Sequence, residues 1–138
     1  MSQLFGSAQP NSDFPQQIDG IDLNLGLELL SGKKLLYLAM LRKFLAGHKQ
    51  ANMAIRSALA EDDRETAELL THNLKGVAGC LGVTVLQKCA ADLESAIRTQ
   101  ASDLEPRLLC FEAALGEVMD DLALKLPEEP APAASLPR

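Results

Sequence analysis

The sequence predicts an all-α protein built as an antiparallel four-helix bundle, with a short N-terminal helix as a lid over it. Four stretches carry apolar residues at the three- and four-residue spacing of amphipathic helices, and short turn segments separate them. Leucine and alanine dominate a composition that is 47% hydrophobic, β-branched residues are few, and no stretch alternates strictly between apolar and polar residues. Long amphipathic helices joined by short turns pack as antiparallel neighbours.

Domain boundaries follow from composition. Residues 1–20 combine glycine and proline with polar residues and are predicted to form a flexible leader. Residues 21–126 carry the amphipathic pattern and form the predicted bundle. Residues 127–138 contain four prolines, cannot continue a helix and are predicted to be a disordered tail rich in proline and alanine.

The first helix begins after a recognisable cap, and the second follows a glycine turn. Asp22 is a suitable N-cap for the short lid helix, whose apolar stripe ends before Gly32. A long helix follows at about residues 33–59, in which Gly47 is a place for a bend. His48 falls on the apolar face of this helix, so we expect a hydrogen-bonded, partly buried side chain.

The other three helices are also bounded by turn residues. A helix at about 63–81 begins at an acidic turn, where the aspartate pair at 62–63 offers an N-cap. Gly82 fits the position after its last turn, where positive φ is favourable for glycine. The next helix is expected from about residue 84, and the last is expected to be capped near Asp103.

Composition excludes several classes of function. The formal net charge is −6, which argues against a nucleic-acid-binding surface, because such a surface needs a basic patch. No apolar run approaches the 18 residues of a membrane span, so we expect no membrane contact by this chain. The three cysteines lack metal-ligand spacing. We therefore expect reduced thiols, no metal site and a cytoplasmic location.

Residues 71–82, with the sequence THNLKGVAGCLG, carry the candidate site. On a helix, His72 lies opposite an apolar arc formed by Leu70, Leu74, Val77, Ala78 and Leu81. Lys75, Gly76 and Gly79 lie beside His72. Glycine inside a helix costs about 1 kcal/mol relative to alanine, so two glycines on an exposed face suggest close approach of another surface.

This pattern resembles the motif of histidine phosphotransfer (HPt) domains of bacterial phosphorelays, His-x-Leu-Lys-Gly-x-Ala-x-x-Leu-Gly. The seven matching residues are His72, Leu74, Lys75, Gly76, Ala78, Leu81 and Gly82. The resemblance extends over residues 22–124. It implies that His72 is phosphorylated and that Lys75 is auxiliary to it. It also implies that the chain works with, or derives from, a hybrid sensor histidine kinase.

The chemistry of the residues agrees with that resemblance. Neutral imidazole is a nucleophile toward phosphoryl groups, and a nearby cation such as Lys75 stabilises charge on the equatorial oxygens. The chain has no phosphate-binding loop with Walker spacing, so we expect no ATP site and no enzyme activity by this chain alone. The resemblance implies that the partner is a receiver domain of a response regulator or hybrid kinase, and that Mg²⁺ is held by that receiver.

Alternative interpretations remain at this stage. A chemotaxis-type kinase has a phosphate-accepting domain with a similar motif, which is phosphorylated directly from an ATP-bound kinase domain. A purely structural module that binds a receiver is a third interpretation. Either Leu69 or Glu94 can be an ordinary surface residue, but Leu69 can also belong to an apolar docking patch and Glu94 can face His72. We expect a monomer, because a bundle of this size closes its own core.

Overall fold

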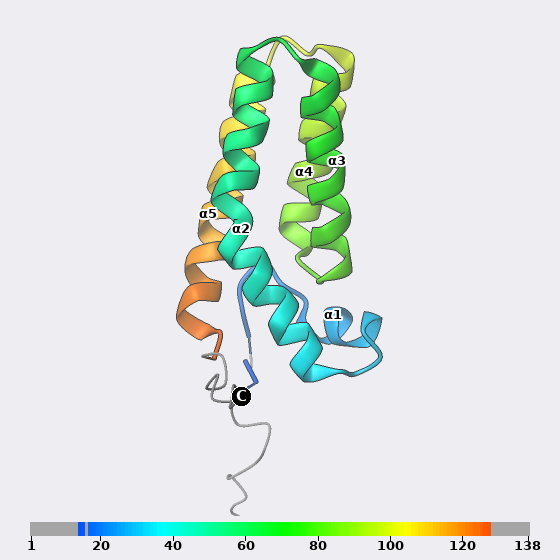
Figure 1. Ribbon diagram of the computed structural model, residues 1–138, viewed down its shortest axis with the longest axis vertical. Helices are drawn as coiled ribbons and strands as arrows, with labels where there is room; N and C mark the ends of the chain where they lie inside the picture. The colour runs from blue at the N-terminus through cyan, green and yellow to red at the C-terminus, as the bar shows by residue number, and fades with distance from the viewer. Residues whose placement is uncertain (1–13, 16, 128–138) are drawn as a thin grey trace, which may run out of the picture.

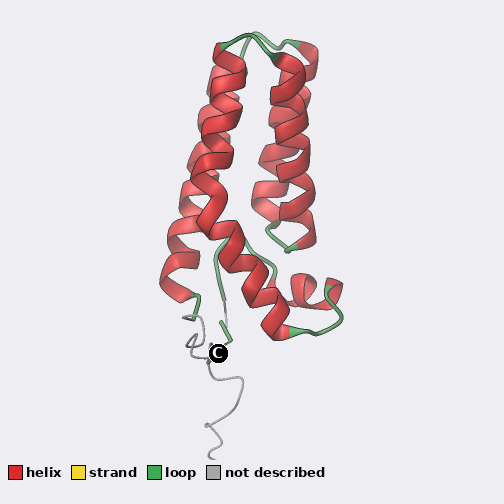
Figure 2. Cartoon of the chain, viewed as in Figure 1, coloured by secondary structure: helices red, strands yellow, loops and turns green. Residues whose placement is uncertain are grey.

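The computed structural model describes residues 14, 15 and 17–127. This part of the chain forms five helices: α1 (Leu23–Leu29), α2 (Lys34–Ala60), α3 (Arg64–Cys80), α4 (Thr84–Thr99) and α5 (Leu104–Lys125). Each boundary of the four long helices falls within a few residues of the predicted position. The described residues contain no β-strand, and their only β-type pairing is an isolated bridge between Ile18 and Ile21 (Figure 2).

The four long helices lie side by side and run antiparallel to their neighbours in the chain, as Figure 1 shows. Each packs against the next along the chain, and α5 returns to contact α2, so the bundle closes. The short α1 packs against α2 and α3 at one end of the bundle. The prediction of an antiparallel four-helix bundle with an N-terminal lid helix is therefore confirmed.

The predicted apolar stripes form the core, with one local exception. The stripe of α4 is buried throughout, and that of α5 is buried from Leu108 onward. In α3, Leu74, Ala78 and Leu81 are buried as expected. Val77 was predicted to belong to the same buried arc, but its side chain is 44% exposed. The arc is broader than the surface that α2 and α4 cover, so its edge stays open to solvent.

Most of the predicted helix ends are present. The carboxylates of Asp22 and Asp63 accept hydrogen bonds from the N–H groups of Leu25 and Thr66 at 3.0 and 3.2 Å, and so cap α1 and α3. The expected cap at Asp103 is only partly correct. Asp103 holds the N-cap position of α5, but its side chain makes no capping hydrogen bond and pairs with Arg107 instead.

The lid helix is held by a tight contact with the turn between α3 and α4. The Tyr37 hydroxyl of α2 donates to the carbonyl of Leu81 at 2.6 Å, and the Asp22 N–H donates to the carbonyl of Gly82 at 2.6 Å. Gly82 has φ of +76° as predicted, and a Cβ there would collide with the Asp22 backbone. A Cβ on Gly26 would likewise collide with Tyr37. These contacts join α1, α2 and the α3–α4 turn into one rigid end.

The packed part of the chain begins earlier than predicted. Ile18, which was assigned to the flexible leader, is 2% exposed and belongs to the core. The Asp19 N–H donates to the Asp121 carboxylate of α5 at 2.9 Å. A single buried isoleucine is too short a signal to separate a packed segment from a polar leader. Residues 1–13 and 16 of the predicted leader and residues 128–138 of the predicted tail lie outside the described residues.

The α2–α5 contact predicts a pH-dependent stability. Glu112 accepts from Arg56 Nε at 2.6 Å and from Asn52 Nδ2 at 2.8 Å. The Arg56 hydrogen bond lowers the pKa of Glu112 below its ordinary value of 4.5, while partial burial opposes the shift. The ionised Glu112 therefore stabilises the fold above pH 4.5. This stabilisation is lost as the pH falls through the pKa that Glu112 has in the folded protein, which is lower than 4.5.

We expect Glu112→Gln to lower the free energy of unfolding at pH 7, because the ion pair with Arg56 is lost. The loss should be only about 1 kcal/mol, because Arg56 is partly exposed and water weakens the ion pair. Below pH 4 the difference from wild type should shrink. Urea denaturation of both proteins at pH 7 and pH 3 measures this. An equal difference at both pH values would mean that the ionised form of Glu112 is not what stabilises the contact.

Candidate functional site

His72 lies on the outer face of α3, where its side chain is 58% exposed. Its position follows from the residues that face inward. Thr71 and Leu74 are buried in the bundle. The buried Thr71 hydroxyl donates a hydrogen bond to the carbonyl of Ala67 at 2.8 Å. Because consecutive helical residues are 100° apart, burying these neighbours turns the imidazole toward solvent.

A buried carboxylate on α4 holds the ring of His72. The Glu94 side chain is only 7% exposed, and its Oε2 lies 2.9 Å from Nδ1 of His72. An ionised carboxylate can only accept hydrogen bonds, so the chemistry of this partner assigns the proton to Nδ1. The lone pair of the neutral ring is then on Nε2, away from Glu94.

Two cations share the same carboxylate. Lys75 Nζ lies 2.7 Å from Oε1 of Glu94, and Arg98 Nη2 lies 2.9 Å from Oε2. Arg98 also donates from Nε to Glu68 on α3 at 2.8 Å. The hydrogen bond from Lys75, followed by that from His72, lowers the pKa of Glu94 below its ordinary value, while burial opposes them. Glu94 is therefore ionised at neutral pH although it is buried.

The structure places the other predicted site residues around His72 in different ways. A Cβ added at Gly76 would meet no atom within 4 Å, so this position is open. Leu69, one turn before His72, is 58% exposed. A Cβ at Gly79 would lie 2.7 Å from Nε2 of Gln87 on α4. The space above Gly79, which we expected to be left for a partner, is therefore used by the chain's own Gln87.

A shallow hollow adjoins the imidazole. It has a volume of about 300 Å³ and is lined by Glu65, Glu68, Leu69, His72 and Glu94. Side chains on a helix lean toward its N-terminus, so the His72 ring lies over this hollow. Lys75 and Gly76 lie on the other side of His72, toward the C-terminal end of α3.

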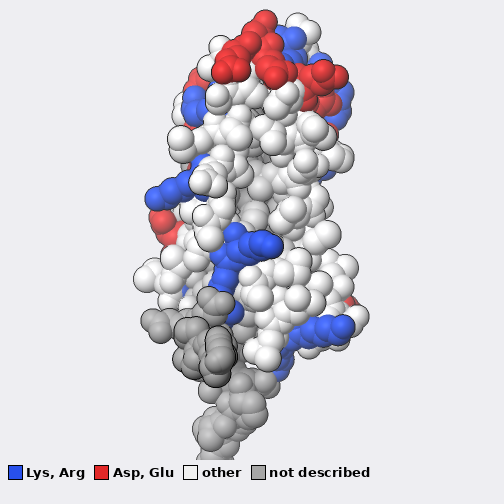
Figure 3. Space-filling view, in the orientation of Figure 1, with Lys and Arg blue, Asp and Glu red and all other residues white. Residues whose placement is uncertain are grey.

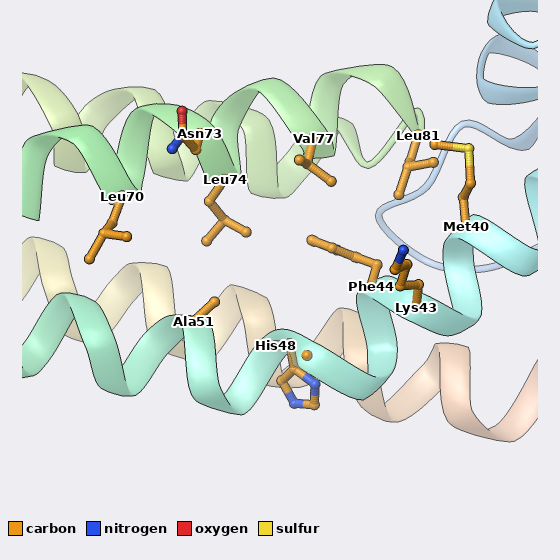
Figure 4. A pocket seen from close by; sticks show the side chains of 11 residues that line it. Met40, Lys43, Phe44, His48, Ala51, Leu70, Asn73, Leu74, Val77 and Leu81 are labelled. Atoms are coloured by element: carbon orange, nitrogen blue, oxygen red, sulfur yellow. The ribbon is translucent and has the colours of Figure 1, made fainter.

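A separate apolar groove of about 460 Å³ runs between α2 and α3 (Figure 4). Its lining residues are Met40, Lys43, Phe44, Gly47, His48, Ala51, Leu70, Asn73, Leu74, Val77 and Leu81. Figure 4 shows Leu74 and Val77 pointing from α3 toward α2, with Phe44 opposite them. The half-exposed Val77 is explained by this groove. Asn73 connects the groove to His72, its neighbour in the chain.

His48 belongs to the wall of the groove. Its Nδ1 lies 2.6 Å from the carbonyl of Leu45, and the side chain is half-buried, as the sequence predicts. Among the described residues, no three His, Cys, Asp or Glu side chains are grouped closely enough to hold a metal ion.

Charge is distributed unevenly over this face. Figure 3 shows acidic residues gathered at the end of the bundle opposite the lid helix, with some basic residues beside them, and mainly basic residues over the middle and the lid end. The acidic end includes the exposed turn of Glu61, Asp62 and Asp63 between α2 and α3. The groove itself has Lys43 as its charged lining residue.

Comparison with known proteins identifies this arrangement. The Hpt domain family model matches residues 39–126, well over half of the chain. The chain belongs to the Hpt domain family. The crystal structure of the HPT domain from a Shewanella sensor hybrid histidine kinase matches with a TM-score of 0.69 and 28% sequence identity. The match covers 81% of this chain and 97% of the Shewanella domain. No curated protein shows significant similarity to the chain.

The chain is thus a histidine phosphotransfer module of a two-component phosphorelay. HPt domains exchange phosphoryl groups with receiver domains, and they are transfer modules rather than enzymes with an ATP site. The matched residues include α3 and α4, which carry the His72–Glu94 pair. None of the described helices is both long enough and apolar enough to span a membrane.

Sequence reasoning predicted that His72 is exposed on α3, which the structure shows, but it left the contact of Glu94 with His72 undecided and did not consider Arg98. The signal for Glu94 is a charged residue beside the buried stripe of α4, between Leu93 and Ile97. A charged residue at the edge of an apolar stripe is common on helix surfaces, so its burial becomes visible only when α3 and α4 are placed together. The same holds for Arg98, which lies one turn further along α4.

We predict that Glu94 determines the tautomer of His72. Replacement by leucine removes the acceptor, so the Nδ1–H form should lose its dominance, whereas Glu94→Gln keeps an amide oxygen as acceptor and should preserve it. Long-range ¹H–¹⁵N NMR of the imidazole rings measures this. His48, whose Nδ1 faces the Leu45 carbonyl, serves as an internal reference that neither substitution should change. An unchanged His72 spectrum in Glu94→Leu would contradict the assignment.

Proposed function

We propose that Nε2 of His72 accepts the phosphoryl group from an aspartyl phosphate of a receiver domain and later passes it to another receiver aspartate. The observation that carries this is the His72–Glu94 pair. Nδ1 is occupied by a buried carboxylate at 2.9 Å, while the rest of the ring is exposed and the adjoining Gly76 is open. A ring held in this way presents one nucleophilic nitrogen to a partner.

The transfer balances without any further reactant. The Nε2 lone pair forms the N–P bond, the P–O bond to the aspartyl carboxyl breaks, and its electron pair stays on the aspartate. The ring, which keeps its Nδ1 proton, gains positive charge as the bond forms. The ionised Glu94 at Nδ1 stabilises that charge, in the way that an aspartate stabilises the imidazolium of a catalytic triad.

Lys75 is the auxiliary cation of this proposal. In the structure its ammonium pairs with Glu94, one helical turn from His72, and its side chain remains 30% exposed. It can therefore turn from Glu94 toward the oxygens of an arriving phosphoryl group, where a cation lowers the energy of the transition state. Glu94 then keeps Arg98 and His72 as partners.

The receiver is proposed to dock over the exposed face of α3, on Leu69 and Gly76. Gly79, which Gln87 partly covers, lies at the border of this surface. The groove between α2 and α3 offers further apolar surface on another side of α3. An exposed apolar patch with a polar rim is typical of a protein-binding surface. The Mg²⁺ required for aspartyl phosphate chemistry is proposed to sit on the receiver.

We further propose that the chain acts as a monomer in the cytoplasm. A closed bundle with a complete core needs no second copy to bury its apolar stripes. Whether the domain works alone or within a hybrid kinase changes neither the site nor its chemistry.

Phosphohistidine detection tests the proposed function. Wild type and His72→Gln are mixed with a phosphorylated receiver domain and Mg²⁺, and His48→Gln is the matched control for loss of a histidine. We expect an acid-labile, alkali-stable label on wild type and on His48→Gln, and none on His72→Gln. A label on His72→Gln would disprove the site. A label only from a kinase domain with ATP would favour the chemotaxis-type donor, and no label from either source would leave a structural receiver-binding module.

Gly76 allows a second test that separates docking from folding. Leucine at this exposed, open position should not disturb the bundle, and it raises helix propensity by up to about 1 kcal/mol. It should nevertheless lower the rate of transfer at least tenfold, because its side chain blocks the approach of the receiver. Gly116 is the matched control, since it is also in a helix with no atom near its missing Cβ, and α5 is diagonal to α3.

We expect Gly116→Leu to keep the wild-type transfer rate, and both variants to unfold no more easily than wild type. Stopped-flow or quenched phosphotransfer and thermal denaturation supply the two measurements. Equal transfer rates in Gly76→Leu and wild type would show that the receiver does not approach across Gly76.

A further inference from the structure

Arg98 connects the two helices that carry the phosphotransfer site. It lies one turn after Glu94 on α4 and donates from Nη2 to Oε2 of Glu94 at 2.9 Å. From Nε it donates to Glu68 of α3 at 2.8 Å. One planar guanidinium thereby joins a carboxylate on each side of the α3–α4 interface, a geometry that lysine cannot reproduce.

The oxygen that Arg98 contacts is the one that His72 uses. Oε2 of Glu94 accepts from both His72 Nδ1 and Arg98 Nη2, while Oε1 accepts from Lys75. Both oxygens of the buried carboxylate therefore have hydrogen-bond donors, from α3 and from α4. The carboxylate cannot rotate without breaking one of these contacts, so Arg98 contributes to fixing the position of the imidazole.

The charges around the ring are nearly balanced. The charged groups that face His72 are Glu65, Glu68 and Lys75 from α3 and Glu94 and Arg98 from α4. An ionised carboxylate whose sole partner is an imidazole favours the imidazolium, because opposite charges attract. An imidazolium has no lone pair and cannot attack phosphorus. The two cations on Glu94 oppose this protonation while leaving the hydrogen bond to Nδ1 intact.

We propose that Arg98 is a positioning residue for phosphotransfer: through Glu94 it holds the His72 ring in place and keeps it in the neutral form with a free Nε2. Glu68 anchors the guanidinium in the orientation that this requires. The proposal rests on His72 being the phosphorylated residue. Arg98 does not contact the phosphoryl group in this proposal, but it affects the fraction of molecules in which His72 is neutral and able to react.

The size of the effect follows from histidine titration. Raising the protonation midpoint of a histidine from about 6.5 to about 7.5 lowers its neutral fraction at pH 7 about threefold. Loss of Arg98 is therefore expected to slow transfer about two- to threefold at pH 7. The deficit should shrink as the pH rises, because an imidazole loses its added proton at high pH.

The experiment compares wild type with Arg98→Met, which keeps an unbranched apolar stem, and with Arg98→Lys, which keeps the charge. Arg107→Met is the matched control. Arg107 also bridges two carboxylates, Asp103 at the N-cap of its own helix and Asp92 on α4, and neither of these contacts involves Glu94. Two quantities are measured: the NMR titration midpoint of the His72 ring, and the rate of transfer from a phosphorylated receiver domain between pH 6.5 and 8.5.

We expect Arg98→Met to titrate at higher pH than wild type by at least half a pH unit, and its relative rate to recover as the pH rises. Arg98→Lys keeps the charge but not the bridge to Glu68, so its midpoint should lie between those of wild type and Arg98→Met, and Arg107→Met should match wild type in both measurements. The proposal is overturned if Arg98→Met titrates like wild type, or if its rate deficit is equal at every pH.

The design separates this proposal from the proposed function. If wild type carries no label on His72, the assignment of the phosphorylated residue fails, whatever the Arg98 variants do. If wild type is labelled at His72 and the Arg98→Met midpoint is unchanged, the role of Arg98 alone fails. The titration midpoint needs no partner protein, so it reports on Arg98 even when transfer cannot be followed.

Discussion

The buried carboxylate of Glu94 is the constraint on which the site depends. A buried charge is unfavourable by several kcal/mol unless donors surround it, and here His72, Lys75 and Arg98 all converge on its two oxygens. Two of these donors come from outside its own helix, so the ionised carboxylate is stable only when α3 and α4 are correctly paired. The same contacts that satisfy the charge orient the imidazole. Folding of the α3–α4 pair and assembly of the candidate site are therefore one event.

The α3–α4 turn sets the alignment of that pair. His72 lies ten residues before Gly82, and Glu94 lies twelve residues after it. At about 1.5 Å per residue, two antiparallel helices bring these positions to nearly the same height above the turn. The turn is fixed by the positive φ of Gly82 and by the contacts of its backbone with Asp22 and Tyr37. The lid helix thus affects the site from a distance, because it fixes the α3–α4 turn, and the turn determines which residues of α3 and α4 lie opposite each other.

Much of this could be predicted from the sequence, and the failures have physical reasons. Periodicity located the four long helices, and the exposed His72 followed from the burial of its neighbours Thr71 and Leu74, since helical geometry is local. Residues whose role depends on a second helix could not be placed: Glu94 gains its meaning from α3, Gly79 is covered by Gln87 of α4, and Val77 opens onto a groove shared with α2. The packing of Ile18 was missed because one apolar residue in a polar segment has no periodicity.

The central claim is that Glu94 reserves Nδ1 and leaves Nε2 to the phosphoryl group. The most direct measurement is ¹H–¹⁵N–³¹P NMR of the uniformly ¹⁵N-labelled, phosphorylated chain, which identifies the ring nitrogen of His72 that is bonded to phosphorus. The account predicts a phosphorus–nitrogen coupling to Nε2, with the Nδ1 proton still hydrogen-bonded to Glu94. Phosphorus on Nδ1 would contradict the account, because the Glu94 contact would then have to break before transfer.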